Sequence, residues 1–208
     1  VSYAVSPDLA VFVQGRQTDF DYDLAAPVNR DATQQSVQIG ASFELSAPFA
    51  GEVSVGSVKE DKDDPAQEDT DSLSLNASLQ WFPTQLTTVT FTGNAGISDP
   101  GIIQATSAKY NRFTVRADHE LFRNVLLFGQ FGFGNYDYQA SSVAPNFARQ
   151  DDNIDARAGV TYKLNKHAHL ELAYRFNSRE SSGTTVANLP FSEDVDSNAI
   201  TASIRVFP

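Results

Sequence analysis

Charged residues recur at positions an even number apart in several segments, and no other feature of this chain is better suited to chemistry. Because successive side chains of a β-strand point to opposite faces, residues spaced by two share one face. Ten charged residues are expected on one such face: Glu44, Arg112, Arg116, Asp118, Glu120, Arg157, Lys163, Glu171, Arg175 and Arg205. Six of them are basic and four are acidic, so the face has mixed charge although the chain as a whole carries -11.

This charged face has two interpretations, and both need the same residues. In the first, it lines a polar conduit and its charges select what passes. In the second, the charges hold neighbouring strands together through cross-strand ion pairs, for example Lys163 with Glu171. The sequence leaves both open.

A second group of charges lies in the run from Glu60 to Asp71, which has seven acidic residues and one lysine. One interpretation is that these carboxylates bind Ca²⁺ or Mg²⁺. The run lacks the glycine and the regular acid spacing of an EF-hand loop. We therefore predict a mobile, solvated acidic loop without a dedicated metal.

The sequence gives little support for catalysis. The three histidines are His119, His167 and His169, and none is accompanied by a nucleophile motif or a third metal ligand. The chain has no cysteine, which excludes disulfides, thiolate metal sites and cysteine nucleophiles. We predict that the protein is not an enzyme and has no cofactor or metal. The strong negative charge also argues against nucleic acid as a partner.

The elements that position the charged face show a period of two, which is typical of half-exposed strands. In residues 156–164, apolar side chains alternate with Arg157, Gly159, Thr161 and Lys163. Segments 10–22 and 125–138 have aromatic residues on both faces, so their faces are not assigned. No run approaches the roughly 18 apolar residues of a transmembrane helix, but barrel strands need to be apolar only at alternate positions.

About eleven strands are predicted, with no convincing helix and no linker, so residues 1–208 are expected to form one domain. The strands span roughly 1–6, 10–22, 33–46, 51–60, 71–82, 87–95, 106–122, 125–138, 151–164, 169–179 and 197–207.

The connections between these strands alternate between short and long. Short turns are predicted at Pro7-Asp8, Ala47-Pro48-Phe49, Pro83-Thr84-Gln85, Arg123-Asn124 and Asn165-Lys166-His167, and long loops at about 23–32, 61–70, 96–105, 139–150 and 180–196. Outer-membrane barrels have short periplasmic turns and longer extracellular loops, whereas a soluble β-sandwich has no reason to place every long loop at one end. The pattern therefore favours an antiparallel up-and-down transmembrane β-barrel over a soluble all-β domain.

The facing of several residues follows from the same alternation. Arg157, Arg175 and Arg205 are expected to point into the lumen. The residues expected to point to lipid are Ala158, Val160, Leu170, Leu172, Ile200, Ala202 and Ile204, with Trp81, Phe82, Tyr162 and Tyr174 near the membrane interfaces.

Four stretches carry a family pattern: Phe20-Asp21-Tyr22 with Asn29-Arg30-Asp31 and Gly40-Ala41-Ser42-Phe43-Glu44-Leu45; Trp81-Phe82-Pro83-Thr84-Gln85-Leu86-Thr87; Asp118-His119-Glu120-Leu121 with Arg123-Asn124; and Arg149-Gln150-Asp151-Asp152 with Tyr162-Lys163-Leu164-Asn165 and Tyr174-Arg175. Through them the chain, from about residue 8 to 180, resembles the beta-barrel porin 2 family of proteobacterial outer membranes. The resemblance implies an outer-membrane pore, an accessory role in polysaccharide secretion and no catalytic residues. The end Phe207-Pro208 departs from the aromatic C-terminus common in such chains.

These observations together predict an outer-membrane pore or channel, or alternatively a structural barrel with a filled lumen that acts through its extracellular loops. The expected partners are outer-membrane lipid, lipopolysaccharide, and secretion-system or envelope proteins. If Phe207 ends in the periplasm, strand alternation places the start of segment 1–6 outside. We therefore expect at least one strand before Val1 and 12 or more in the intact barrel. The alternative is that the short segment 1–6 is a lead-in outside the membrane, which would leave a barrel of ten strands.

Overall fold

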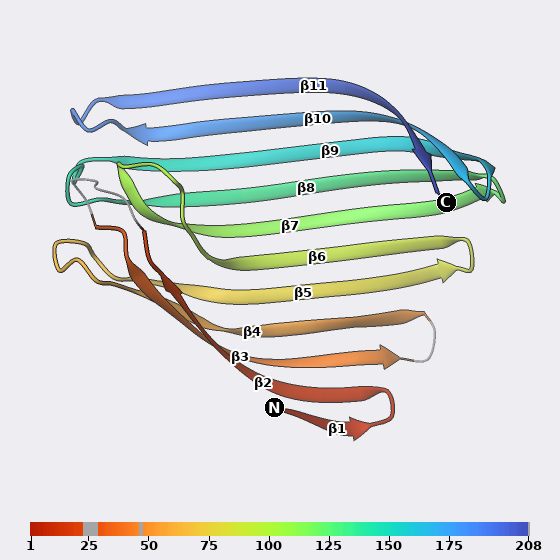
Figure 1. Ribbon diagram of the computed structural model, residues 1–208, viewed down its shortest axis with the longest axis horizontal. Coiled ribbons are helices and arrows are strands. Elements are labelled where there is room, and N and C mark those ends of the chain that lie inside the picture. Colours follow the sequence, from red (N-terminus) through yellow and green to blue (C-terminus); the bar gives the residue numbers. More distant parts are fainter. Residues whose placement is uncertain (23–28, 46–47, 208) are drawn as a thin grey trace.

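The computed structural model describes residues 1–22, 29–45 and 48–207, and its strands form one antiparallel sheet in sequence order (Figure 1). The strands are β1 (Ser2–Ser6), β2 (Leu9–Phe20), β3 (Ala32–Leu45), β4 (Phe49–Lys62), β5 (Thr70–Thr84), β6 (Thr87–Ser98), β7 (Ala105–Phe122), β8 (Val125–Ala140), β9 (Ala148–Asn165), β10 (Ala168–Thr184) and β11 (Pro190–Val206). The predicted eleven-stranded, all-β antiparallel architecture is confirmed. Within the described residues, the structure contains no helix with the length and apolarity needed to span a membrane.

The predicted alternation of connections is also confirmed, because the short turns gather at one end of the sheet and the longer loops at the other (Figure 1). The turn predicted at Ala47-Pro48-Phe49 lies partly outside the described residues, as does most of the loop predicted at 23–32. Each hairpin reverses the chain, so β1 and β11 run in the same direction.

The long loops after β4, β6, β8 and β10 are shorter than predicted, and the bounds 180–196 are wrong, because only residues 185–189 separate β10 from β11. Strands β10 and β11 stay paired without interruption from Ala168↔Val206 to Thr184↔Pro190. The prediction took the polar composition of this segment as a sign of a loop. Polar residues can pair as strands when both faces of the hairpin meet water, because the ladder hydrogen bonds come from the backbone.

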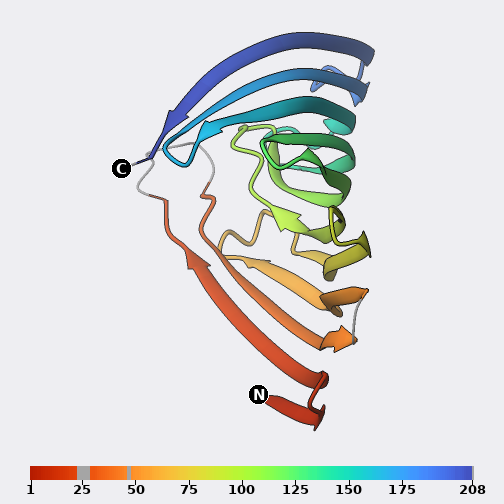
Figure 2. The same ribbon diagram turned by 90° about the vertical axis from the view of Figure 1, so that its right-hand side faces the viewer.

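The sheet is strongly bent (Figure 2), so it has a concave and a convex face. Gln38 on β3 donates a hydrogen bond to Ser74 on β5 across the intervening strand, and Arg112 on β7 reaches Asp155 on β9. Side chains two strands apart meet in this way only on the inner side of a bend. These contacts therefore identify the concave face.

The concave face also accounts for β8, which covers one of the two segments whose faces the sequence did not assign. On β8, Phe128 lies on the concave face while Phe131 and Phe133 lie on the convex face and are exposed. The Phe128 ring occupies the space above Gly159 on β9, where a Cβ atom would meet it at 2.6 Å. A glycine here is the reason that an aromatic side chain fits on the polar side.

The sheet ends at two edges. Among the described residues, β1 pairs only with β2 and β11 only with β10, so closure of the sheet into a barrel is not seen. Buried apolar side chains are few and mostly small, for example Ala32, Ala105 and Ala108. The fold therefore relies on a continuous ladder of strand pairing, and its large apolar side chains remain on the surface.

Candidate functional site

All ten charged residues predicted to share a face occupy the concave side in the strand register. Each lies an even number of residues from a side chain that makes a concave-face contact, such as Gln38 on β3, Arg112 on β7 or Arg157 on β9. The bent sheet therefore gathers onto one surface charges from strands that are far apart in the sequence. Their role in lining a conduit stays a prediction.

Two ion pairs occupy the middle of this surface. Arg116 donates two hydrogen bonds to Asp118, at 2.7 and 2.6 Å, and Arg157 donates one to Glu171 at 2.6 Å. The ring of Phe128 lies between the two arginines, with guanidinium carbons 4.7 and 5.0 Å from its centroid. An aromatic ring attracts cations through its quadrupole, so Phe128 holds both guanidinium groups in place.

The cross-strand pair given as an example, Lys163 with Glu171, does not form. Thr161 is opposite Glu171 in the register and Lys163 is opposite His169. Glu171 pairs instead with Arg157, which lies diagonally on the same face. The sequence offered both basic partners and held no information on the register that selects one.

Strand register arranges the arginines of this surface in two rows that cross the strands. The first row joins Arg116 on β7, Gln130 on β8, Arg157 on β9 and Arg175 on β10. The second row, four residues further along each strand, joins Arg112, Gly134, Asn153 and Arg179. Around the side chains of this second row, on the concave face, lies a hollow of about 350 Å³.

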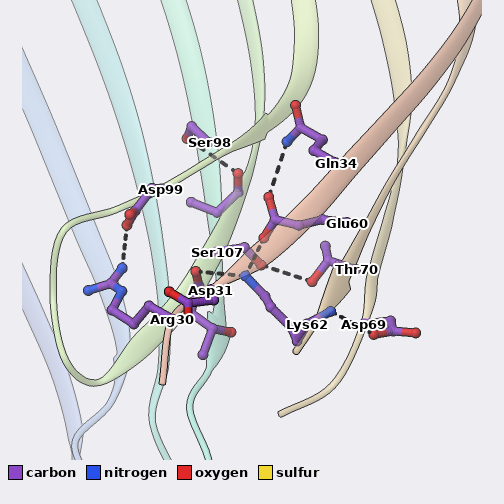
Figure 3. Close-up of polar contacts among 12 residues, drawn as sticks. Arg30, Asp31, Gln34, Glu60, Lys62, Asp69, Thr70, Ser98, Asp99 and Ser107 are labelled. Atoms are coloured by element: carbon purple, nitrogen blue, oxygen red, sulfur yellow. Dashed lines mark hydrogen bonds and ion pairs between the residues drawn. The ribbon is translucent and has the colours of Figure 1, made fainter. Parts of the chain in front are cut away.

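At the end with the long loops, a cluster of polar side chains links β3, β4 and β5 to β6 and β7 (Figure 3). Arg30, in the segment before β3, pairs with Asp99 after β6 and donates to the carbonyl of Ile102 at 3.2 Å. The Tyr22 hydroxyl also donates to Asp99, and the Arg30 guanidinium lies 5.8 Å from the Tyr22 ring centroid. The loops after β2 and β6 are thus tied across the inside of the bend.

A buried ion pair supports the same cluster. Lys62 pairs with Glu60, and their side chains are only 4% and 7% exposed. Lys62 also donates to the carbonyl of Thr106 on β7 at 3.2 Å, and Glu60 accepts from Gln34 on β3 at 3.1 Å (Figure 3). Removing one partner of such a pair leaves an uncompensated buried charge, which is strongly destabilising.

The electrostatics of the cluster perturb two groups. Burial and the hydrogen bond to Asp99 raise the pKa of Tyr22 to about 12. The pKa of Asp69 is lowered, because its carboxylate accepts a hydrogen bond from the Lys62 backbone N–H and lies near the Lys59 ammonium. Both groups stay in the charge state that their contacts require at neutral pH.

The acidic run predicted as a loop is partly strand, because β4 extends to Lys62 and β5 begins at Thr70. Gln67 donates from its side chain to Ser142 Oγ at 2.7 Å and accepts from the Ser142 N–H at 3.0 Å. The loop is thus joined to the β8–β9 connection. In the described part of the chain, no group of three His, Cys, Asp or Glu residues is placed to hold a metal ion.

The histidines do not meet on the concave face. His119 lies on the convex side and its Nδ1 shares a hydrogen bond of 2.9 Å with Thr87. His167 Nδ1 is 3.3 Å from the Phe207 carbonyl, and the His169 ring packs against the Phe207 ring. These contacts give each histidine a local structural role near the short turns.

The residues of the loop-end cluster were missed from the sequence, for two reasons. Glu60 ends the predicted strand 51–60, and extending that strand by two residues would have placed Lys62 on the same face. Arg30 and Asp99 are 69 residues apart and lie outside the strands, so no spacing signals their contact. The concave face of the sheet therefore carries a continuous array of charged groups and hydrogen-bond donors.

Comparison with known proteins gives one match by family. The family model described as putative beta-barrel porin 2 matches residues 1–206. No curated protein matches the chain.

Proposed function

The chain belongs to the putative beta-barrel porin 2 family, and on that basis we propose that its sheet closes into an outer-membrane barrel whose concave face lines a water-filled pore. The family is a porin family and not an enzyme family. The proposal assigns the ten predicted charged residues to the pore lining and the convex face to lipid.

The observation that carries this proposal is the separation of side chains between the two faces. Large apolar residues stay exposed on the convex face, among them Ile39 at 61%, Leu172 at 52% and Ile200 at 77%. A monomeric soluble protein rarely leaves so continuous an apolar surface in water. The concave face carries the ion pairs and amides instead, which is the reverse of a soluble β-sandwich, where the inner face is apolar.

The height of the apolar band fits a bilayer. On β9 the convex residues from Ile154 to Leu164 are apolar or aromatic at every second position. Ten residue steps at about 3.3 Å, tilted about 40° from the barrel axis, project to roughly 25 Å. Outer-membrane barrels have an outward apolar band of about 25 Å.

Closure is constrained by strand direction. Since β1 and β11 run in the same direction, pairing them directly would give a parallel contact. An all-antiparallel barrel therefore needs one further strand between these edges, or pairing of β11 with β2 in place of β1. Either arrangement satisfies the edge N–H and C=O groups, which lipid cannot do.

The expected size favours an open lumen over a filled one. About twelve strands, spaced by about 4.8 Å and tilted about 40°, give a backbone radius of roughly 12 Å. Each inward side-chain layer occupies about 5 Å, half the distance between packed sheets, so an opening on the order of 10–14 Å remains. Barrels of about eight strands are filled by side chains.

The partners follow from the same placement. The convex face is proposed to contact outer-membrane lipid, and the long-loop end to contact lipopolysaccharide. Docking to secretion-system or envelope proteins, as an accessory of polysaccharide secretion, is proposed from the family resemblance.

The function is tested by reconstituting the purified full-length protein in planar bilayers and in liposomes. A pore gives discrete conductance steps and lets small hydrophilic solutes enter the liposomes at size-dependent rates. Folded, inserted protein that gives neither conductance nor solute entry would establish the alternative, a barrel with a filled lumen.

A further inference from the structure

The arginines of the concave face are unequally neutralised, and this inequality is the starting point of the inference. Arg116 and Arg157 are paired with Asp118 and Glu171. Among the described residues, neither Arg175 nor Arg179 makes an ion pair. Each guanidinium has five N–H donors, so these two arginines keep capacity for an added anion.

The arginines of the first row reduce the stability of the sheet. Arg157 and Arg175 occupy directly opposed positions on β9 and β10. Like charges directly opposite each other on one face of a sheet are destabilising. Proteins tend to break such local rules at functional sites, so this repulsion points to a role beyond holding the strands together.

The hollow of the second row is built for a ligand with anionic oxygens. Its walls include Arg112 on β7 and Arg179 on β10, with Tyr136, Asn153, Asn177 and Ser197 between or beside them. The carboxylate of Asp155 and the apolar side chain of Val195 also line the hollow, so an anion bound there must compete with Asp155 for Arg112. Arg112 is half exposed, at 52%, and its contact with Asp155 is long, at 3.5 Å. Gly134 lies between Arg112 and Asn153 in the row and lines the hollow without a side chain of its own.

The spacing lets two arginines act on one ligand. Arg112 and Arg179 lie in the same row three strands apart, about 14 Å between their backbones at ~4.8 Å per strand. Guanidinium groups bind carboxylate and phosphate through paired N–H donors. The amides and hydroxyl groups around the hollow add uncharged donors.

We propose that this hollow is a binding site for solutes that carry a carboxylate or phosphate group, held between Arg112 and Arg179, and that Arg175 draws such anions along the wall. The inference rests on the proposed pore function for its physiological meaning. It concerns the class of solute that the pore prefers, although the chain carries a net charge of -11. Of this charge, -6 belongs to the acidic run from Glu60 to Asp71, none of whose residues lines the hollow.

The test is calorimetric titration of the full-length protein in detergent with inorganic phosphate and, separately, with succinate. We expect saturable binding of at least one of them. The variant Arg112→Gln/Arg179→Gln should lose it, with a weakening of about tenfold or more for each lost charged hydrogen-bonding group. The matched control is Arg123→Gln/Lys166→Gln, which removes the same charge from two short turns outside the hollow and should bind as the unmodified protein does.

Several results would overturn the proposal. These are no saturable binding of either anion, equal binding by the Arg112→Gln/Arg179→Gln variant, or an equal loss in the control variant. Arg112→Lys/Arg179→Lys keeps the charge and folding while removing the planar fork, and it should weaken binding by less than the glutamine variant. Anion binding without bilayer conductance would refute the proposed pore function but not the anion site. Conductance without anion binding would refute the anion site but not the pore function.

Discussion

The two faces of β9 offer a matched pair of substitutions at adjacent positions. Val160 lies on the convex face and Thr161 on the concave face, and both are half-buried side chains of nearly equal size. We predict that Val160→Arg destabilises the inserted protein strongly and that Thr161→Arg does not. Thr161 is opposite Glu171, so an arginine there gains a carboxylate neighbour.

The magnitude follows from the position of Val160 in the apolar band. The band on β9 runs from Ile154 to Leu164, so Val160 is one residue from its centre, about 2.5 Å from the midplane after projection. An arginine on the lipid face near the midplane costs about 2–4 kcal/mol. That cost lowers the folding equilibrium constant roughly 30- to 700-fold.

The assay is reversible guanidinium unfolding of the protein in phospholipid vesicles, followed by the fluorescence of Trp81, the only tryptophan. Trp81 lies on the convex face and stacks on Phe49, so its signal changes when the strands leave the bilayer. If Thr161→Arg costs as much as Val160→Arg, or if neither costs more than about 1 kcal/mol, the assignment of the convex face to lipid is wrong.

Three further predictions concern single groups. The pKa of Tyr22 is raised from 10.0 to about 12. The protonated hydroxyl that donates to Asp99 therefore contributes fully to the stability of the fold below pH 10, and this contribution is lost as the pH rises through 12. In a tyrosinate absorbance titration, Tyr22→Phe should therefore remove a late phase, and an unchanged curve would contradict this. Phe128→Ala should cost about 3–5 kcal/mol in the same unfolding assay, because the ring is 8% exposed, whereas Phe131→Ala on the convex face should cost clearly less; equal costs would refute the role of Phe128 between the arginines. Calorimetry should detect no tight stoichiometric Ca²⁺ binding at the acidic loop, and such binding, if lost on replacing Asp63 and Asp64, would overturn our reading of that loop.

The sequence predicted the facing of β9, β10 and β11 because their alternation is not interrupted. In β9 every second residue from Ala156 to Leu164 is apolar or aromatic, so only one assignment of its residues to the two faces is consistent with the sequence. In β8 the same test fails, since Phe128 and Phe131 lie on opposite faces. Phe128 belongs on the polar face for reasons that no local pattern contains: it covers Gly159 and packs against two arginines from other strands.

The ends of the strands and the loop-end cluster were beyond local reasoning for a different reason. Polarity near 180–196 indicated exposure to water, but exposure does not prevent strand pairing, and β10 and β11 continue to Thr184 and Pro190. Arg30 precedes β3 and Asp99 follows β6, so the two side chains meet only because the sheet bends across the strands between them. The degree of bending depends on how all of these strands pair. Bending is a collective property, so it is read from the structure and not from the spacing of residues.

Single-channel recording of cysteine variants tests most directly whether the concave face lines a pore. The chain has no native cysteine, so one introduced thiol reports on one position. Asn177 and Phe176 are neighbours on β10 that face the concave and convex sides. In planar bilayers, a charged, membrane-impermeant thiol reagent should change the current of open Asn177→Cys channels in a single step and leave Phe176→Cys channels unchanged. A change at Phe176→Cys with none at Asn177→Cys would contradict the account.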